Sequence, residues 1–149
     1  MAARYQIMLN IHEPITGTGI ERTYPNILTR EGAKGQEYEG GKIRLNHATI
    51  LPFTRMLAGA FDYTPGIFDL SNPAKRVYTT LARQLAFYVI FYSGMQMLGE
   101  RPEVYDKYPK VFEFLKEMQV NWQTTIPILG KIWEYFVVER QDRDSSDWY

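Results

Sequence analysis

The chain has 149 residues, a length that suits a single domain and allows a substantial core to be buried. Apolar residues make up 45%, and 17 basic residues balance 17 acidic ones, so nothing favours binding to nucleic acid or to an anionic membrane. The absence of cysteine excludes disulfides and thiolate metal sites. The chain contains no apolar run of membrane-spanning length, and its first residues lack the apolar region of a signal peptide.

The first third of the sequence predicts two strands joined by a long loop. Residues 6–11 form a short apolar run, typical of a strand buried on both faces. Residues 12–48 have no sustained helical or strand period, and loops of this length in compact domains are usually functional or disordered. Apolar residues within the loop favour order, and Thr29 is expected to cap a helical turn over 29–31. Residues 49–54 predict the second strand, ending near its proline.

The middle of the sequence predicts helices. Residues 74–92 give the clearest helical periodicity, and the second half is apolar on every face, which indicates deep packing. Residues 95–98 predict a brief third strand. Residues 102–118 predict a second helix, divided into two short pieces at Pro109.

The last segment predicts antiparallel structure. Residues 122–127 are expected to be irregular, and the alternation of apolar and polar side chains over 131–140 predicts a half-buried strand. Residues 142–146 predict a turn and 147–149 the start of a returning strand. The full order of strand, long loop, strand, helix, strand and helix is typical of a portion of an α/β barrel, and we expect a fragment of a larger architecture.

Three glutamates on the long loop are the strongest candidates for chemistry. Glu13 directly follows the first predicted strand, where barrel enzymes place catalytic side chains. Glu31 and Glu37 flank a glycine-containing turn that could bring both toward Glu13. Converging carboxylates favour a hard cation, calcium before magnesium. A carboxylate pair is also what glycoside hydrolysis requires. Three solvated glutamates on a surface loop remain the alternative.

Other polar residues carry weaker signals. His12 is expected to point to the face opposite Glu13, as a structural or a ligand-binding histidine, and His47 lacks the neighbours of a zinc site. Arg22 and Arg55 could grip a carboxylate, although structural ion pairs are the more ordinary role. Trp122 and Trp133 are candidates for sugar stacking or for the core.

The order of several long motifs is specific. N-I-H-E-P, G-I-E-R-T-Y-P-N, T-R-E-G-A-K-G-Q-E-Y-E and H-A-T-I-L-P-F-T-R-M-L-A-G-A-F-D-Y-T-P-G-I-F occur in turn, followed by T-T-L-A-R-Q-L-A-F-Y-V-I-F-Y-S and Y-D-K-Y-P-K-V-F-E-F-L. Over essentially all its length the chain resembles glycoside hydrolase family 97, the α-glucosidases and α-galactosidases of Bacteroidetes. The resemblance implies residues 1–130 as the C-terminal part of a catalytic (β/α)8 TIM barrel and 131–149 as the start of a C-terminal β-sandwich domain.

The resemblance also implies roles for individual residues. Glu13, Glu31 and Glu37 match calcium-binding glutamates, Glu37 also matches the general acid, and His12 borders the sugar-binding subsite. Glu13 matches the catalytic base of the inverting α-glucosidase branch, a glutamate that the retaining α-galactosidase branch lacks. The H-E-P motif therefore favours a calcium-dependent, inverting α-glucosidase acting on oligosaccharides.

Two alternatives stay open: a retaining α-galactosidase of the same family, and a non-catalytic carbohydrate-binding or structural fragment. The family architecture implies an N-terminal half that this sequence does not contain, and we expect these 149 residues alone to be inactive. The resemblance implies a periplasmic or secreted location for the full-length protein.

Overall fold

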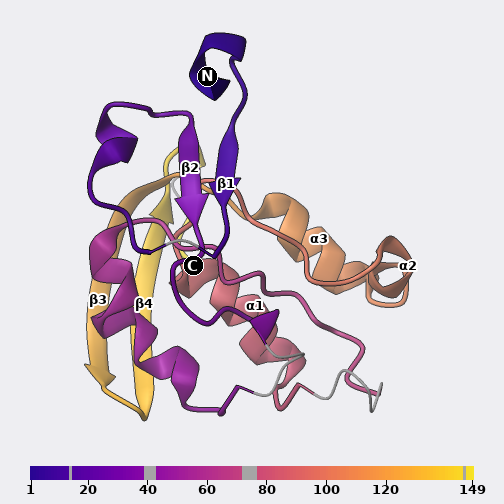
Figure 1. Cartoon of the computed structure of the whole chain (residues 1–149). Helices are drawn as coiled ribbons and strands as arrows, with labels where there is room; N and C mark the ends of the chain where they lie inside the picture. Colours follow the sequence, from indigo (N-terminus) through magenta and orange to yellow (C-terminus); the bar gives the residue numbers. More distant parts are fainter. Residues whose placement is uncertain (14, 39–42, 72–76, 146) are drawn as a thin grey trace.

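The computed structural model describes every residue except 14, 39–42, 72–76 and 146. The described part is a mixed α/β structure with a small parallel sheet, a two-stranded antiparallel hairpin and three α-helices (Figure 1). Short 3-10 helices, beginning with η1 (Ala2–Tyr5) and η2 (Ile20–Arg22), occupy much of the first half of the chain. None of the described helices is long and apolar enough to cross a membrane.

The parallel sheet is the part of the fold that positions the candidate site. Strands β1 (Leu9–Ile11) and β2 (Ile27–Arg30) lie side by side and pair in parallel (Figure 1). Two further segments lie next to β2. Arg30 forms a parallel bridge with Phe61, and the Phe61 N–H donates to the Tyr92 carbonyl at 2.8 Å. The described residues thus form one row of neighbouring segments and no closed barrel.

Two predictions about this region are wrong. The first strand forms, but it is shorter than the predicted 6–11. All three of its residues are only half-buried, whereas the prediction was burial on both faces. The segment 12–48 contains β2, which takes the place of the helical turn expected at 29–31. Thr29 is buried in β2, and the Ser93 hydroxyl donates to its hydroxyl at 2.9 Å, so its side chain serves a tertiary contact.

The strand predicted over residues 49–54 is also wrong. Three consecutive 3-10 helices occupy this region: η4 (His47–Thr49), η5 (Leu51–Phe53) and η6 (Arg55–Ala58). Pro52 has no N–H for a sheet, and its fixed φ suits the first turn of a helix. The hydroxyls of Thr49 and Thr54 donate to backbone carbonyls three and four residues earlier, which stabilises local turns instead of a ladder.

Helix α1 (Leu81–Ile90) is shorter than the predicted helix over 74–92. The Thr80 hydroxyl accepts the Arg83 N–H at 3.1 Å and so caps the helix one residue before it starts. Residues 77–80 are not helical, and 74–76 lie outside the described residues. The third strand expected at 95–98 does not form.

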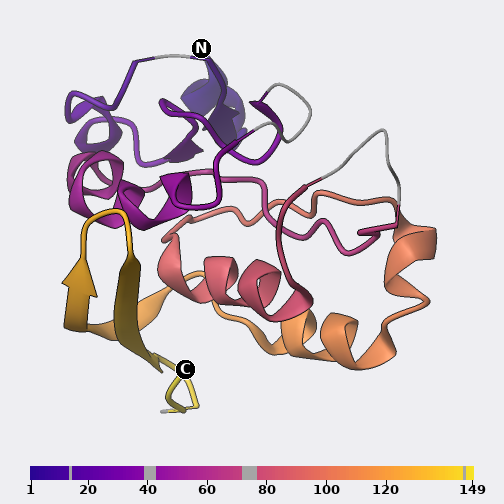
Figure 2. The same ribbon diagram turned by 90° about the horizontal axis from the view of Figure 1, so that it is seen from below.

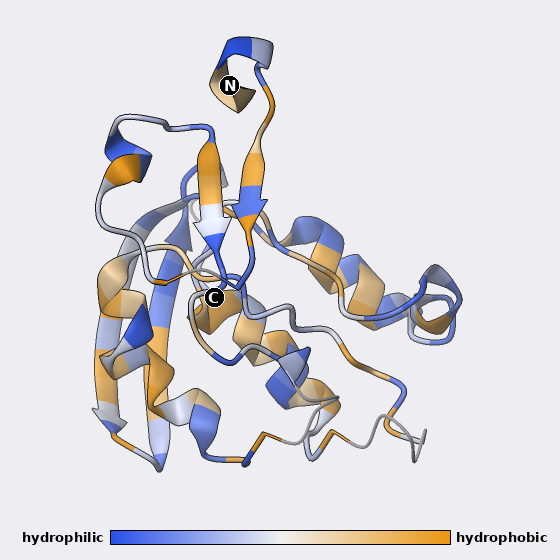
Figure 3. Ribbon diagram, viewed as in Figure 1, coloured by the Kyte–Doolittle hydropathy of each residue, from blue (hydrophilic) through white to orange (hydrophobic). Residues whose placement is uncertain are grey.

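Helix α1 contributes to two apolar clusters, and Figure 3 shows both hydrophobic and hydrophilic residues along it. Phe87 and Phe91 belong to the first cluster, and Leu81 and Leu85 pack against the second. The first cluster comprises Ala48, Leu51, Phe61, Tyr63, Phe87 and Phe91. The second comprises Phe68, Val104 and Tyr105, and Leu81, Leu85, Tyr108, Val111 and Leu115 pack against it.

The second predicted helix is confirmed in both of its pieces. Helix α2 (Pro102–Tyr105) and helix α3 (Pro109–Glu117) are separated at Pro109, which occupies the first position of α3. Val111 and Leu115 pack against the second cluster, whereas Phe112 is 39% exposed.

The C-terminal segment is a hairpin of β3 (Trp122–Lys131) and β4 (Tyr135–Asp142), seen beside the 3-10 helices in Figure 2. The irregular segment predicted at 122–127 is therefore wrong, because these residues form the first half of β3. The returning strand is present as a bridge between Gln141 and Trp148. The Arg140 guanidinium joins the hairpin to α1 by donating to the Ile90 carbonyl at 2.9 Å.

Two glycines with positive φ provide a matched test of this packing. Gly66 has φ +96°, and an added Cβ would lie 2.3 Å from the Tyr88 hydroxyl; Gly59 has φ +105° and open space around the same position. We expect Gly59→Ala to cost only backbone strain, roughly 1–3 kcal/mol. Gly66→Ala should cost about 1–3 kcal/mol more, because the Tyr88 and Tyr105 hydroxyls must move. Urea unfolding measures both, and equal losses would show that the close contact is unimportant.

Candidate active site

The candidate site lies where the parallel segments end. The Glu31 N–H donates to the Ile11 carbonyl at 2.9 Å, and the Asp62 N–H donates to the Arg30 carbonyl at 2.8 Å. These backbone bonds place the residues after β1, after β2 and after Phe61 next to one another. Polar groups at the carboxyl ends of adjacent parallel strands are the usual position of an active site in α/β proteins.

Glu13 and Glu31 are joined directly. The Glu13 N–H donates to the Glu31 carboxylate at 2.9 Å, which fixes the position of that carboxylate. Glu13 itself has φ +56°, an unusual value for a residue other than glycine. Strained backbone of this kind persists only where surrounding contacts enforce it, and it is common at functional sites.

His12 stands between two further carboxylates. Its Nε2 lies 2.7 Å from Asp62 and its Nδ1 lies 3.7 Å from Glu37. Burial alone would lower the pKa of His12, but the hydrogen bond to Asp62 and the charges of Asp62, Glu31 and Glu37 together raise that pKa above its usual value. The ring is one-third exposed, so it is fixed on one side and accessible on the other.

The predicted residues line one hollow of about 610 Å³. Its wall consists of His12, Glu13, Glu31, Gly32, Ala33, Lys34, Glu37 and Tyr38. The structure therefore brings together all four residues that the sequence singled out. The volume suits a small ligand such as a sugar unit, and the wall supplies several polar groups to orient one.

The three glutamates supply the oxygen donors that calcium prefers. In the described part of the chain, however, no three His, Cys, Asp or Glu side chains stand close enough together to hold a metal ion. Glu13, Glu31 and Glu37 therefore carry suitable oxygen donors and share one hollow, but their present arrangement does not form a metal site.

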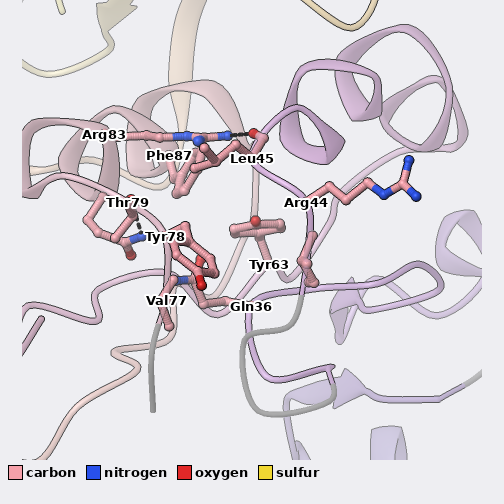
Figure 4. Close-up of a pocket in the computed structure, with 11 residues that line it drawn as sticks. Gln36, Arg44, Leu45, Tyr63, Val77, Tyr78, Thr79, Arg83 and Phe87 are labelled. Atoms are coloured by element: carbon pink, nitrogen blue, oxygen red, sulfur yellow. Dashed lines mark hydrogen bonds between the residues drawn. The ribbon is translucent and has the colours of Figure 1, made fainter. Parts of the chain in front are cut away.

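A second hollow is lined by other residues and is much smaller. It measures about 20 Å³ and lies between Tyr63, Arg83 and Phe87, close to Gln36 (Figure 4). This space holds about one water molecule and no sugar. Burial raises the pKa of Tyr63 to about 12, so its hydroxyl stays protonated through neutral pH.

The weaker candidates do not line the hollow. His47 lies 3.1 Å from the Lys34 carbonyl, outside the hollow. Arg55 binds backbone carbonyls instead of the expected carboxylate, and Arg22 is exposed. Trp122 packs against Tyr149.

Sequence reasoning missed Asp62 and Asn10. The Asp62 carboxylate accepts the Thr64 N–H at 2.9 Å, a local contact that marks no functional site in the sequence. Its contact with His12 joins residues 50 positions apart and leaves no local pattern. A strand period of two gives the one available signal, since it places Asn10 on the same face as His12.

Comparisons with known proteins place the chain among sequences and structures of one family. A model described as glycoside hydrolase 97 matches residues 1–33. Among solved structures, a family 97 enzyme from Pseudoalteromonas sp. strain K8 in complex with acarbose is 42% identical and has a TM-score of 0.88; the match covers 99% of this chain and 24% of that one. A variant of that enzyme is in complex with panose.

Two curated relatives carry a different activity in their names. A retaining alpha-galactosidase of Bacteroides thetaiotaomicron is 33% identical over 100% of this chain and 24% of its own length. A probable retaining alpha-galactosidase of Streptomyces bingchenggensis is 34% identical over 93% of this chain and 21% of its own length.

The fold, the carboxylate-lined hollow and these relatives class the chain with the glycoside hydrolases. More narrowly, it belongs to glycoside hydrolase family 97. The chain spans about a quarter of the length of the relatives it matches.

Proposed function

We propose that the protein containing this chain hydrolyses α-glucosidic bonds in oligosaccharides with inversion at the anomeric carbon. The observation that supports this most directly is that Glu13 and Glu37 line the same hollow, with His12 beside them. Glycoside hydrolysis with inversion requires two carboxyl groups on opposite sides of the sugar, with room for a water molecule.

In this mechanism Glu37 is the general acid and Glu13 the general base. Glu37 donates a proton to the glycosidic oxygen while the bond from that oxygen to the anomeric carbon breaks. Glu13 removes a proton from the water that attacks the anomeric carbon from the other face. Glu37 ends as a carboxylate and Glu13 ends protonated, so the pair must exchange protons with solvent before the next turnover. The exposure of the Glu37 side chain, 59%, permits that exchange.

We also propose that Glu13, Glu31 and Glu37 supply part of the ligand set of a calcium ion. When bound, the ion supplies positive charge that offsets the repulsion among the carboxylates. Glu31 is the best-fixed of the three, because its carboxylate accepts the Glu13 N–H.

A retaining α-galactosidase is the second candidate function. It is favoured by the two curated relatives, whose names state that activity. Retention requires a carboxylate nucleophile about 5–5.5 Å from the acid, and a covalent glycosyl intermediate. The two candidates differ in substrate and in the first anomer released.

The stereochemical outcome distinguishes the two candidates. We expect the natural protein that contains this segment to release β-glucose first from an α-glucoside, as proton NMR of the anomeric signals shows within the first minutes. Initial release of α-galactose from an α-galactoside would favour the second candidate. Inactivity of that protein on both sugars would reject the proposed function.

A second test concerns Glu37. We expect Glu37→Gln to lower kcat on natural oligosaccharides by about 10²–10⁴-fold, the usual contribution of general acid catalysis. The loss should be much smaller on aryl glycosides with good leaving groups, which need little protonation. Glu113→Gln, on the exposed side of α3, is the control and should change neither rate. Equal losses by Glu37→Gln on both substrate types would argue against a general acid.

The third test concerns calcium. A ligand that binds only the folded state stabilises it by RT ln(1 + [L]/Kd), about 2.7 kcal/mol at 100 times Kd. We expect calcium to raise the Tm of the protein and Glu31→Gln to abolish that rise, because an amide is a weaker calcium ligand than a carboxylate. Glu113→Gln should keep the full rise. The same Tm with and without millimolar calcium would exclude the site.

A further inference from the structure

The Asp62 carboxylate is the most buried charged group near the hollow, with 1% of its side chain exposed. A carboxylate buried to this extent is costly unless its oxygens accept hydrogen bonds. The donors come from three residues of two separate segments: Asn10 and His12 at β1, and Thr64 immediately after Asp62. The lone pairs on both oxygens are thereby occupied.

The two oxygens of Asp62 have different partners. Oδ1 accepts the Thr64 N–H at 2.9 Å and the Thr64 hydroxyl at 3.1 Å, and Thr64 is held at φ +51°. Oδ2 lies 2.7 Å from His12 Nε2 and also accepts the Asn10 amide. Because the flanking residues Phe61 and Tyr63 are both buried in the first apolar cluster, the carboxylate has little freedom to rotate.

The chemistry of this contact determines which proton the imidazole carries. An ionised carboxylate can only accept hydrogen bonds, so His12 Nε2 must hold the proton that it donates to Asp62. The nitrogen that remains on the exposed side is Nδ1, which lies 3.7 Å from the Glu37 carboxylate. In the neutral ring Nδ1 is then an acceptor, suited to a sugar hydroxyl or to the protonated form of Glu37.

We propose that Asp62 is a positioning residue that holds His12 in its Nε2–H tautomer and turns Nδ1 toward Glu37 and the hollow. The role in catalysis rests on the proposed function; the tautomer does not. Asp62 would act through His12 and would not touch the substrate itself. Residues of this kind fix the geometry of a neighbouring group in the site, and small displacements of such groups lower the rate.

Asp62→Asn gives a specific prediction because an amide has one acceptor and one donor side. The Thr64 N–H can only donate, so the introduced amide must turn its oxygen to Thr64 and its NH2 toward His12. His12 can meet that NH2 only with an unprotonated Nε2. Asn10 can adapt as well, since its Oδ1 is buried without a partner. We therefore expect the substitution to convert His12 to the Nδ1–H tautomer.

The experiment is nitrogen NMR of the histidine-labelled protein at a pH where the rings are neutral. The His12 signal is identified by its loss in His12→Gln. We expect the Nε2–H tautomer in the wild type and the Nδ1–H tautomer in Asp62→Asn. The control is Asp69→Asn, since Asp69 accepts the Ser71 N–H in a similar turn away from the hollow and should leave His12 unchanged. His47, whose Nε2 faces the Lys34 carbonyl, should stay Nε2–H in every variant.

An Nδ1–H tautomer of His12 in the wild type would overturn the proposal, and this measurement does not depend on whether Asp62→Asn folds. An unchanged tautomer in a folded Asp62→Asn would overturn it as well. In the activity assay, Asp62→Asn should lower kcat on oligosaccharides by about 10²-fold or more with a smaller change in KM. A changed tautomer with unaltered kcat would overturn the role in catalysis. Inactivity of the natural protein that contains this segment on all glycosides would reject the proposed function and leave the tautomer result valid.

Discussion

A buried arginine joins two neighbouring segments by hydrogen bonds next to the candidate site. Arg55 is 5% exposed, and its guanidinium donates to the carbonyls of Arg30, Glu31, Gly59 and Ala60 at 2.9–3.2 Å. These carbonyls belong to the end of β2 and to the residues just before Phe61, so one side chain joins both. Burial lowers the pKa of Arg55, but its ordinary value is so high that the group stays charged at neutral pH. Without it, several carbonyls at this edge would lose their donors.

In this arrangement some residues of the candidate site are held by hydrogen bonds, whereas the Glu37 side chain is exposed to solvent. Glu13, Glu31, His12 and Asp62 are held by backbone or buried side-chain bonds near the strand ends. Glu37 differs, because only the adjacent backbone is anchored: the Gln36 N–H donates to the Tyr63 carbonyl at 2.7 Å, while the Glu37 side chain is 59% exposed. Exposure suits the role proposed for Glu37, because a general acid must recover a proton from solvent after each turnover. Fixed hydrogen bonds suit the role proposed for Asp62, which is to orient His12.

The features that the sequence predicted correctly depend on neighbours close along the chain. The separation of α2 and α3 follows from Pro109 alone, and the position of Glu13 follows from the end of an apolar run. Strand β2 was missed because four residues carry almost no periodicity, and their partner strand lies 18 residues earlier, from Ile27 back to Leu9. The 3-10 helices at 47–58 were missed because local hydroxyl-to-carbonyl bonds outweigh the β-propensity of the apolar residues. The family motifs singled out residues that line one hollow, because such motifs carry tertiary information that a single periodicity does not.

The buried polar contacts also explain why one register of these segments is preferred. Asp62 lies between two aromatic residues of the core, so its carboxylate is held away from water. The carboxylate therefore needs hydrogen-bond donors from β1. A shift of β1 by one residue would exchange the faces of its side chains and present Ile11 where Asn10 or His12 now stands. Such a shift would leave the carboxylate without two of its donors, a cost of several kcal/mol for a buried charge. The apolar clusters hold the segments together, while this carboxylate selects the register that brings His12 to the hollow.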